Sequence, residues 1–208
     1  MPVDNRWGTE RAEAFSDGVI AIAITLLVLD IGIPAADFGD LLHGIWRQWP
    51  AYLGFVTSFM TIGGIWLAHH AVFRRLRLLN GRVMALNLLL LMVVSFLPFP
   101  TRLVAEAIRE TQAERVAVVF YGLTLLAISV VFAALWRAAL ADRALLREEV
   151  DDEQIAAVTR ATTPNVGFYV ITTALGLLAP KVAAFGYLVI AVRAVLSARG
   201  DTTAPSSR

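Results

Sequence analysis

Cysteine is absent from this chain of 208 residues, and Lys181 is the single lysine among its 18 basic residues. Without cysteine, the chain has no disulfide, iron–sulfur cluster or thiolate-bound zinc. The formal net charge of +1 argues against nucleic-acid binding, because no basic surface outweighs the acids. The apolar segments also lack acidic residues spaced so that they could bind one metal ion together. We therefore expect no metal site, no cofactor and no enzymatic activity.

Apolar residues make up 58% of the chain and occur in long blocks. A helix needs about 20 mainly apolar residues to cross ~30 Å of hydrocarbon. Hydropathy therefore predicts an all-α membrane protein in the lipid bilayer, with six transmembrane helices at about 14–33, 50–72, 83–101, 115–136, 165–179 and 181–197. Pro98 and Pro100 are expected to end the third span, and Pro180 to mark a hairpin turn between the last two.

The basic residues predict the orientation of these spans. With a cytoplasmic N-terminus, the inner segments hold thirteen basic residues and the outer segments five. This excess favours cytoplasmic N- and C-termini in a multi-pass protein of the cell membrane. Residues 1–199 form one predicted six-span unit with a cytoplasmic helical linker at about 140–162, and the composition of 200–208 is typical of a disordered tail.

A stripe of residues follows one side of the first span. At 100° per residue, Gly18, Ile22, Thr25 and Leu29 fall within about 40° of one another, with Leu26 on the flank. Around a symmetry axis, rings of branched aliphatic side chains can gate by dewetting, and a hydroxyl ring can replace part of an ion's hydration shell. Alternatively, the aliphatic side chains pack against helices or lipid while the hydroxyl binds its own helix, and periodicity alone favours this second interpretation.

Ionisable groups also enter the predicted membrane segments. Asp17 follows Ser16 at the start of the first span, where a charge must pair within the bundle or line a water-filled path. His69 and His70 are adjacent and point about 100° apart on a helix, so they cannot easily bind one metal ion. We expect one of the two to be buried and hydrogen-bonded to Asp17 or Ser16.

Two motifs resemble a known family. The first span carries Arg-x-x-x-Phe-Ser-Asp, at Arg11, Phe15, Ser16 and Asp17, followed by an apolar run to residue 30. This resembles the first-helix signature of the transmembrane protein 175 family of potassium channels. Trp66-Leu67-Ala68-His69-His70 is similar to the Trp-x-x-His-His of that family's second helix. The motifs cover roughly the first hundred residues, and the remainder matches by topology.

The resemblance implies a potassium-selective cation channel that has no carbonyl selectivity filter. Single-unit members assemble as homotetramers, in which the first helices line a central pore and the permeant potassium ion is the ligand. Carried over by position, Ile22 would be the hydrophobic constriction, Thr25 the hydroxyl layer, and Leu26 and Leu29 further layers.

The same resemblance implies a polar network that holds the pore helix to its neighbours. Its members would be Arg11, Phe15, Ser16, Asp17, Trp66, His69 and His70, and we assign Asn87, a lone amide in the third span, to the same network. An alternative is a proton-coupled or proton-leak carrier that uses Asp17 and His70 as a relay, although the first four spans show no helix break of the kind carriers use.

The segment after the first span has two possible roles. Its acids could form a vestibule that concentrates cations, or they could belong to a solvated loop; they are Asp30, Asp37 and Asp40. The aromatic residues at the start of the second span fit a membrane-interface belt; they are Trp46, Trp49 and Tyr52.

Overall fold

A computed structural model of the chain describes residues 7–108 and 111–200. The elements in chain order are β1 (Trp7–Gly8), α1 (Thr9–Leu26), η1 (Leu27–Asp30), η2 (Ala35–Asp40), α2 (Leu41–Arg47), α3 (Trp49–Phe73), β2 (Leu78–Leu79), α4 (Gly81–Phe96), α5 (Pro98–Ala107), α6 (Thr111–Leu140), η3 (Arg143–Leu145), α7 (Asp152–Leu178) and α8 (Pro180–Gly200).

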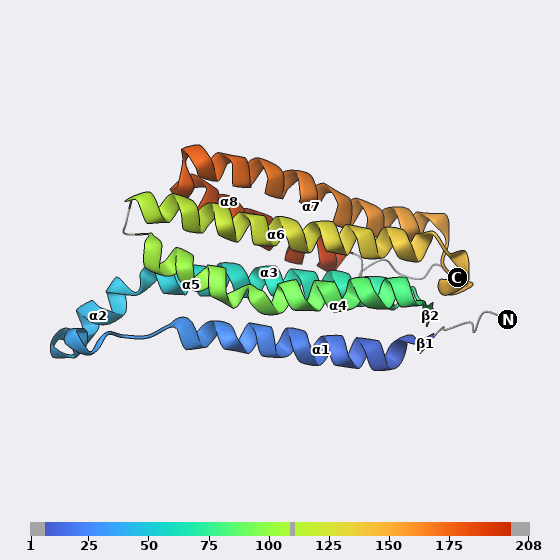
Figure 1. The fold of residues 1–208 in the computed structure, drawn as a ribbon, viewed down its shortest axis with the longest axis horizontal. Helices are drawn as coiled ribbons and strands as arrows, with labels where there is room; N and C mark the ends of the chain where they lie inside the picture. Colours follow the sequence, from blue (N-terminus) through green and yellow to red (C-terminus); the bar gives the residue numbers. More distant parts are fainter. Residues whose placement is uncertain (1–6, 109–110, 201–208) are drawn as a thin grey trace.

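The long helices lie alongside one another and alternate in direction (Figure 1). Helix α1 forms one edge of the bundle and packs against α3 and α4. Helices α6 and α7 form the opposite edge, and α8 packs against α3, α6 and α7. Among residues 7–108 and 111–200, no helix therefore packs against the other side of α1.

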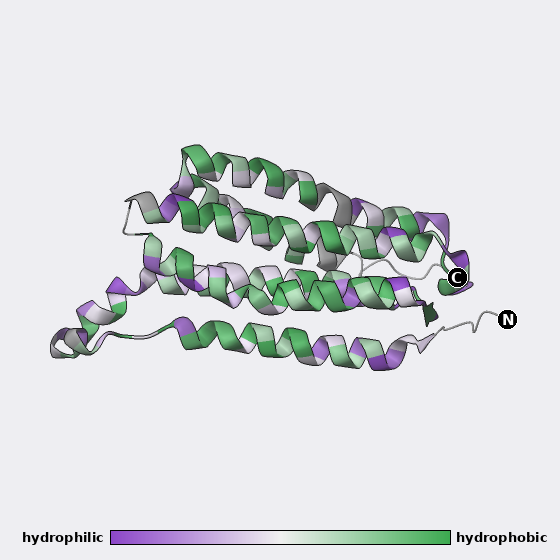
Figure 2. Cartoon of the chain, viewed as in Figure 1, coloured by the Kyte–Doolittle hydropathy of each residue, from purple (hydrophilic) through white to green (hydrophobic). Residues whose placement is uncertain are grey.

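Four helical segments among the described residues are long and apolar enough to cross a membrane. They are Thr9–Asp30, Trp49–Phe73, Gly81–Ala107 and Ala113–Leu140, and a shorter apolar helix covers Val166–Leu178. Figure 2 shows hydrophobic residues along most of these helices, with hydrophilic residues gathered toward the ends. The chain is therefore a multi-pass membrane protein.

The prolines act as predicted in one turn and differently in another. Helix α7 ends at Leu178, Ala179 leaves the helical conformation, and Pro180 begins α8, which packs back on α7 as a hairpin. Helix α4 ends at Phe96, just before Pro98, as predicted, but the apolar segment continues beyond the prolines to Ala107. It resumes as α5 at Pro98, since a proline in the first turn of a helix removes no helical hydrogen bond.

The predicted linker is divided between a loop and a helix. The side chain of Asp151 accepts a hydrogen bond from the Gln154 backbone N–H at 2.7 Å, and this N-cap starts α7 at Asp152. The second half of the linker therefore belongs to the same helix as the fifth predicted span. Residues 201–208 of the predicted tail lie outside the described residues, and Gly200 is the last residue of α8.

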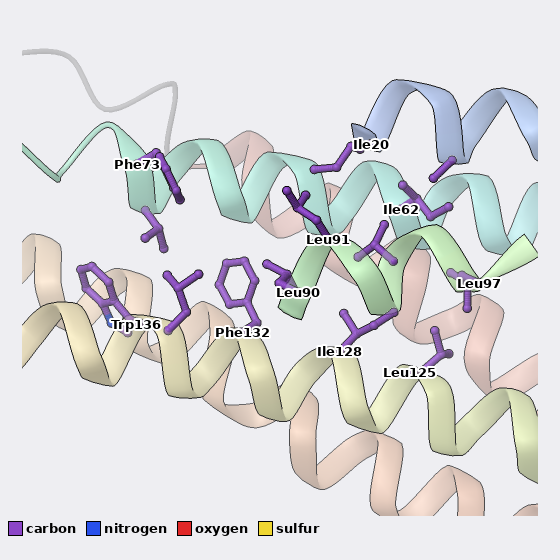
Figure 3. Packing of buried hydrophobic residues seen from close by; sticks show 14 of the residues in the cluster. Ile20, Ile62, Phe73, Leu90, Leu91, Leu97, Leu125, Ile128, Phe132 and Trp136 are labelled. Atoms are coloured by element: carbon purple, nitrogen blue, oxygen red, sulfur yellow. The ribbon is translucent and has the colours of Figure 1, made fainter. Parts of the chain in front are cut away.

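The apolar core lies between α1, α3, α4 and α6. Figure 3 shows Leu90 and Leu91 of α4 lying between Ile20 of α1 and Phe132 of α6. All four side chains are buried. Helix α1 is thus fixed to the bundle by one apolar edge, and this contact sets its rotation about its own axis.

A small sheet fixes the start of α1. Trp7 pairs with Leu79, and Gly8 with Leu78, as an antiparallel ladder. The same α3–α4 connection also contacts the α6–α7 connection, because the backbone N–H of Arg77 donates to the carbonyl of Leu145 at 2.8 Å. The entry to α1 is therefore joined through backbone hydrogen bonds to the far half of the bundle.

Candidate functional site

Helix α1 has a buried side that matches the helical period. Its buried residues are Thr9, Ala12, Ser16, Ile20 and Ala23, and Leu27 in η1 continues the same edge. Intervals of three and four residues place these side chains on one face, toward α3 and α4. Small residues near the start of the helix let α1 approach its neighbours closely.

The predicted pore residues lie on the other side of α1. Ile22 is 61% exposed and Leu29 is 75% exposed, and Leu26 and Thr25 are exposed with them. The Thr25 hydroxyl donates to the Ile22 carbonyl at 2.9 Å, so its oxygen keeps lone pairs that can accept from outside the helix. The face is apolar with one hydroxyl, a composition that suits contact with lipid, another copy of the chain or a narrow pore.

A buried hydrogen-bond chain joins α3, α4 and α1. Asn87 accepts from His69 Nε2 at 2.9 Å and donates from its amide to Ser16 Oγ at 3.0 Å. Ser16 Oγ in turn donates to the Ala12 carbonyl at 2.7 Å. The expectation that a histidine binds Ser16 or Asp17 directly was wrong, because the Asn87 amide lies between the imidazole and the hydroxyl. The His69 ring also stacks on Phe73, with ring centroids 4.1 Å apart.

A second polar group joins α1 to α3 at the surface of the bundle. Trp66 donates from Nε1 to Asp17 Oδ1 at 2.8 Å, and His70 Nδ1 lies 2.9 Å from Glu13 Oε1. The Trp66 and His70 rings stack with centroids 6.0 Å apart. Asp17 therefore contacts Trp66, whereas His70 contacts Glu13. The two neighbouring histidines also differ, because His69 is buried against Asn87 and His70 lies against the carboxylate of Glu13.

Two predicted members of the network stand apart from it. Arg11 and Phe15 are exposed on α1, and none of the hydrogen bonds of the two groups above involves them. Glu13 was missed by sequence reasoning, although it precedes Asp17 by four residues. That spacing puts both carboxylates on one helix face and could have identified Glu13 as a second acceptor toward α3.

A hydroxyl cluster in the other half of the bundle was also missed. Ser58 Oγ lies 2.7 Å from Thr101 Oγ1 and 3.0 Å from the Tyr121 hydroxyl, which joins α3, α5 and α6. No sequence signal connects three hydroxyls on separate helices. Within residues 7–108 and 111–200, no three histidine or acidic side chains come together as a metal site would require.

Comparisons with known proteins identify relatives of this chain. The family model described as endosomal/lysosomal potassium channel TMEM175 matches residues 11–98, a range that includes both polar groups. A potassium channel of Streptomyces collinus is 50% identical over 127 residues, which are 61% of this chain and 62% of that protein, so the match spans less than two thirds of that relative.

Two further comparisons cover more of the chain. A potassium channel of Chamaesiphon minutus is 43% identical over 171 residues, which are 80% of this chain and 83% of that protein. The crystal structure of a lysosomal potassium-selective channel TMEM175 homolog from Chamaesiphon minutus aligns with a TM-score of 0.83 and 38% identity, over 91% of this chain and 97% of that one.

Proposed function

This chain belongs to the TMEM175 family of ion channels, and from that premise we propose that it is a potassium-selective cation channel. Ions pass through a pore lined by the α1 helices of several copies, and Ile22 forms the hydrophobic constriction. No carbonyl filter is involved. Selectivity arises at the Thr25 layer, where hydroxyl oxygens replace part of the hydration shell of the ion.

The exposed side of α1 is the observation that supports this proposal. Ile22, Leu26 and Leu29 form an apolar stripe on a membrane-spanning helix at the edge of the bundle. Opposite this stripe, buried contacts to α3 and α4 hold the helix at a fixed rotation. A pore wall needs this combination, because the lining residues must keep one orientation while ions pass.

The proposed assembly is a homotetramer of six-span subunits in the cell membrane, with both termini in the cytoplasm. Helices α7 and α8 supply the fifth and sixth spans. Five polar residues hold α1 in position and do not contact the ion in this proposal. They are Ser16, Asp17, His69, His70 and Asn87. The alignment with the Chamaesiphon minutus homolog covers 97% of that chain, which supports a single subunit of this length.

Potassium and sodium flux into proteoliposomes tests the pore assignment. Replacing Ile22 with Asn wets the constriction, so we expect conductance or the potassium-to-sodium ratio to change severalfold. Because the chain has no cysteine, Ile22→Cys introduces its sole thiol. A water-soluble methanethiosulfonate reagent should block flux through Ile22→Cys and leave flux through the matched control Ile171→Cys unchanged, since Ile171 is similarly exposed, at 67% against 61%, but lies on α7. Equal responses of the two variants contradict the assignment.

The proton-carrier alternative makes a different prediction in the same liposomes. A relay through Asp17 and His70 requires the two groups to exchange protons, whereas Asp17 binds Trp66 and His70 lies against Glu13. A fixed stoichiometry between protons and potassium, abolished by His70→Gln, would favour the carrier. Passive potassium flux that follows its electrochemical gradient without proton coupling would favour the channel.

A further inference from the structure

A small cavity lies inside the bundle, between α3, α6, α7 and α8. Its volume is about 50 Å³, and the described residues that line it include none of α1, so it is separate from the proposed pore face. Small residues form its walls on α3 and α8: Gly64, Ala68, Ala191 and Ala194. A Cβ added at Gly64 would lie 3.2 Å from the Ala194 Cβ, so these two helices approach each other closely. The short side chains leave space between that wall and α6.

The lining of the cavity is partly apolar and partly polar. Leu125, Ile128 and Phe132 project from α6 into the core and form its apolar part (Figure 3). Its polar part consists of three hydroxyls from three helices: Thr61 of α3, Ser129 of α6 and Tyr169 of α7. Thr61 lies 12 residues from each end of α3, so the cavity is far from either membrane surface.

Tyr169 is the residue that points to a polar ligand in this cavity. Its side chain is more than nine-tenths buried, at 7% exposure. The other two tyrosine hydroxyls of the core have partners. Tyr121 lies 3.0 Å from Ser58 Oγ, and Tyr187 donates to Thr173 Oγ1 at 3.2 Å. Within residues 7–108 and 111–200, no group forms a hydrogen bond with the Tyr169 hydroxyl, and protein atoms do not fully enclose its oxygen. A buried phenol normally has a partner, so this hydroxyl needs one from the cavity.

The other two hydroxyls can bind the same ligand. Ser129 is partly buried, and in the described part of the chain its hydroxyl forms no hydrogen bond. Thr61 donates to the Thr57 carbonyl at 2.8 Å, so its oxygen keeps lone pairs that can accept. Donors from Ser129 and Tyr169 and an acceptor from Thr61 suit a molecule that both donates and accepts hydrogen bonds.

Water fits this cavity better than lipid or empty space. A cavity needs about 10–15 Å³ for each water molecule, so a volume of about 50 Å³ has room for about three. Cavities that stay empty in proteins are apolar, whereas this one is lined by three hydroxyls. A hydrocarbon tail neither donates nor accepts hydrogen bonds, so it would leave these hydroxyls unpaired at a cost in free energy.

We propose that this cavity is a water-binding site in which about three water molecules bridge the hydroxyls of Thr61, Ser129 and Tyr169. The waters connect α3, α6 and α7 by hydrogen bonds at a depth where small residues leave these helices short of direct contacts. Each water-mediated bond is nearly as favourable in enthalpy as a direct one. The site does not depend on the proposed function, because it lies within one copy of the chain and away from α1.

Radiolytic footprinting of the protein in proteoliposomes tests the site. X-rays split water into hydroxyl radicals, which oxidise the side chains next to a bound water before they diffuse away. We expect Tyr169 to be oxidised roughly tenfold faster than Trp136, measured by mass spectrometry and corrected for intrinsic reactivity. Trp136 is a matched control, since it is a buried aromatic residue at 2% exposure whose Nε1 donates to Thr159 Oγ1. Equal rates for the two side chains would overturn the proposal.

Filling the cavity gives a second test. Ser129→Leu places a larger apolar side chain in the space and should expel the water, so oxidation of Tyr169 should slow roughly fivefold while that of Trp136 stays the same. Ser95→Leu makes the same substitution on the exposed side of α4 and should leave Tyr169 at its original rate. Ser129→Val replaces Ser129→Leu if the larger side chain prevents folding.

Two outcomes of these measurements would contradict the water site. Oxidation of Tyr169 that stays fast in a folded Ser129→Leu or Ser129→Val variant would show that the radicals come from elsewhere. Oxidation of Tyr169 that is fast in detergent micelles and lost in proteoliposomes would identify a lipid tail as the occupant.

Discussion

Trp66 donates a hydrogen bond from its indole Nε1 to Asp17 Oδ1 at 2.8 Å, across a sequence separation of 49 residues. The bond places a carboxyl group of α1 against a donor of α3 at the edge of the bundle. The indole N–H thereby gives a hydrogen-bond donor to a carboxylate that lies in a membrane segment. Together with the buried chain through Asn87, it connects α1 to its neighbours on two sides.

We predict that Trp66 and Asp17 are energetically coupled. Trp66→Phe removes the donor, and Asp17→Ala removes the acceptor, so the second substitution should cost less once the first is present. A double-mutant cycle measured by SDS-induced unfolding in mixed micelles should give a coupling free energy of about 1 kcal/mol or more, compared with about 0.6 kcal/mol for an average hydrogen bond between membrane helices. Additive effects would show that this bond contributes nothing to holding α1.

Asn87 should be among the most sensitive polar positions of the chain. Asn87→Leu leaves the His69 Nε2 donor and the Ser16 hydroxyl without their partner in a buried site, and we expect a loss of about 1–3 kcal/mol in the free energy of unfolding. Ser95→Ala on the exposed side of α4 is the control and should change stability by less than about 0.5 kcal/mol. Equal effects in thermal unfolding would argue against the buried chain.

Gly122 is required by the close approach of Tyr187 to α6. A Cβ at this position would clash with the Tyr187 hydroxyl and with Thr173 Oγ1. Gly122→Ala should therefore destabilise the protein by about 1–3 kcal/mol, and the loss should be smaller in a Tyr187→Phe background, which lacks the hydroxyl.

Gly63 offers a matched control for this substitution. No atom lies within 4 Å of a Cβ added there, so Gly63→Ala should be neutral or should stabilise α3 by up to about 1 kcal/mol. If Gly122→Ala and Gly63→Ala unfold at the same temperature, the packing of Tyr187 against α6 is not as close as described.

Thr25 should affect selectivity without affecting stability. Thr25→Val keeps the shape of the side chain and removes its oxygen, so the potassium-to-sodium permeability ratio from bi-ionic reversal potentials should fall severalfold. Thr25→Ser keeps a hydroxyl and should retain most of the ratio. Because the side chain is exposed in the subunit, thermal unfolding should shift little in either variant. An unchanged ratio in Thr25→Val would place the selective layer elsewhere.

Much of the fold follows from local patterns in the sequence. Apolar blocks predicted where the long helices lie, because hydropathy and length are properties of a continuous segment. They did not predict that α7 begins at Asp152, 13 residues before the fifth predicted span at 165, because its first turns are polar. The stripe of Ile22, Thr25 and Leu29 followed from the helical period, and all three residues are exposed together in the structure. The end of the third span was misplaced, since a proline in a first helical turn looks the same in sequence as one that ends a helix.

The sequence by itself determined which segments can cross a membrane and which residues share a face of α1. Only the tertiary structure decided the partners: Asn87 stands between His69 and Ser16, Glu13 lies against His70, and Ser58 meets Thr101 and Tyr121. The physical reason is that a helix's period is set by its own backbone, whereas contacts between helices depend on their relative rotation and offset. Those are set by the packing of the whole bundle.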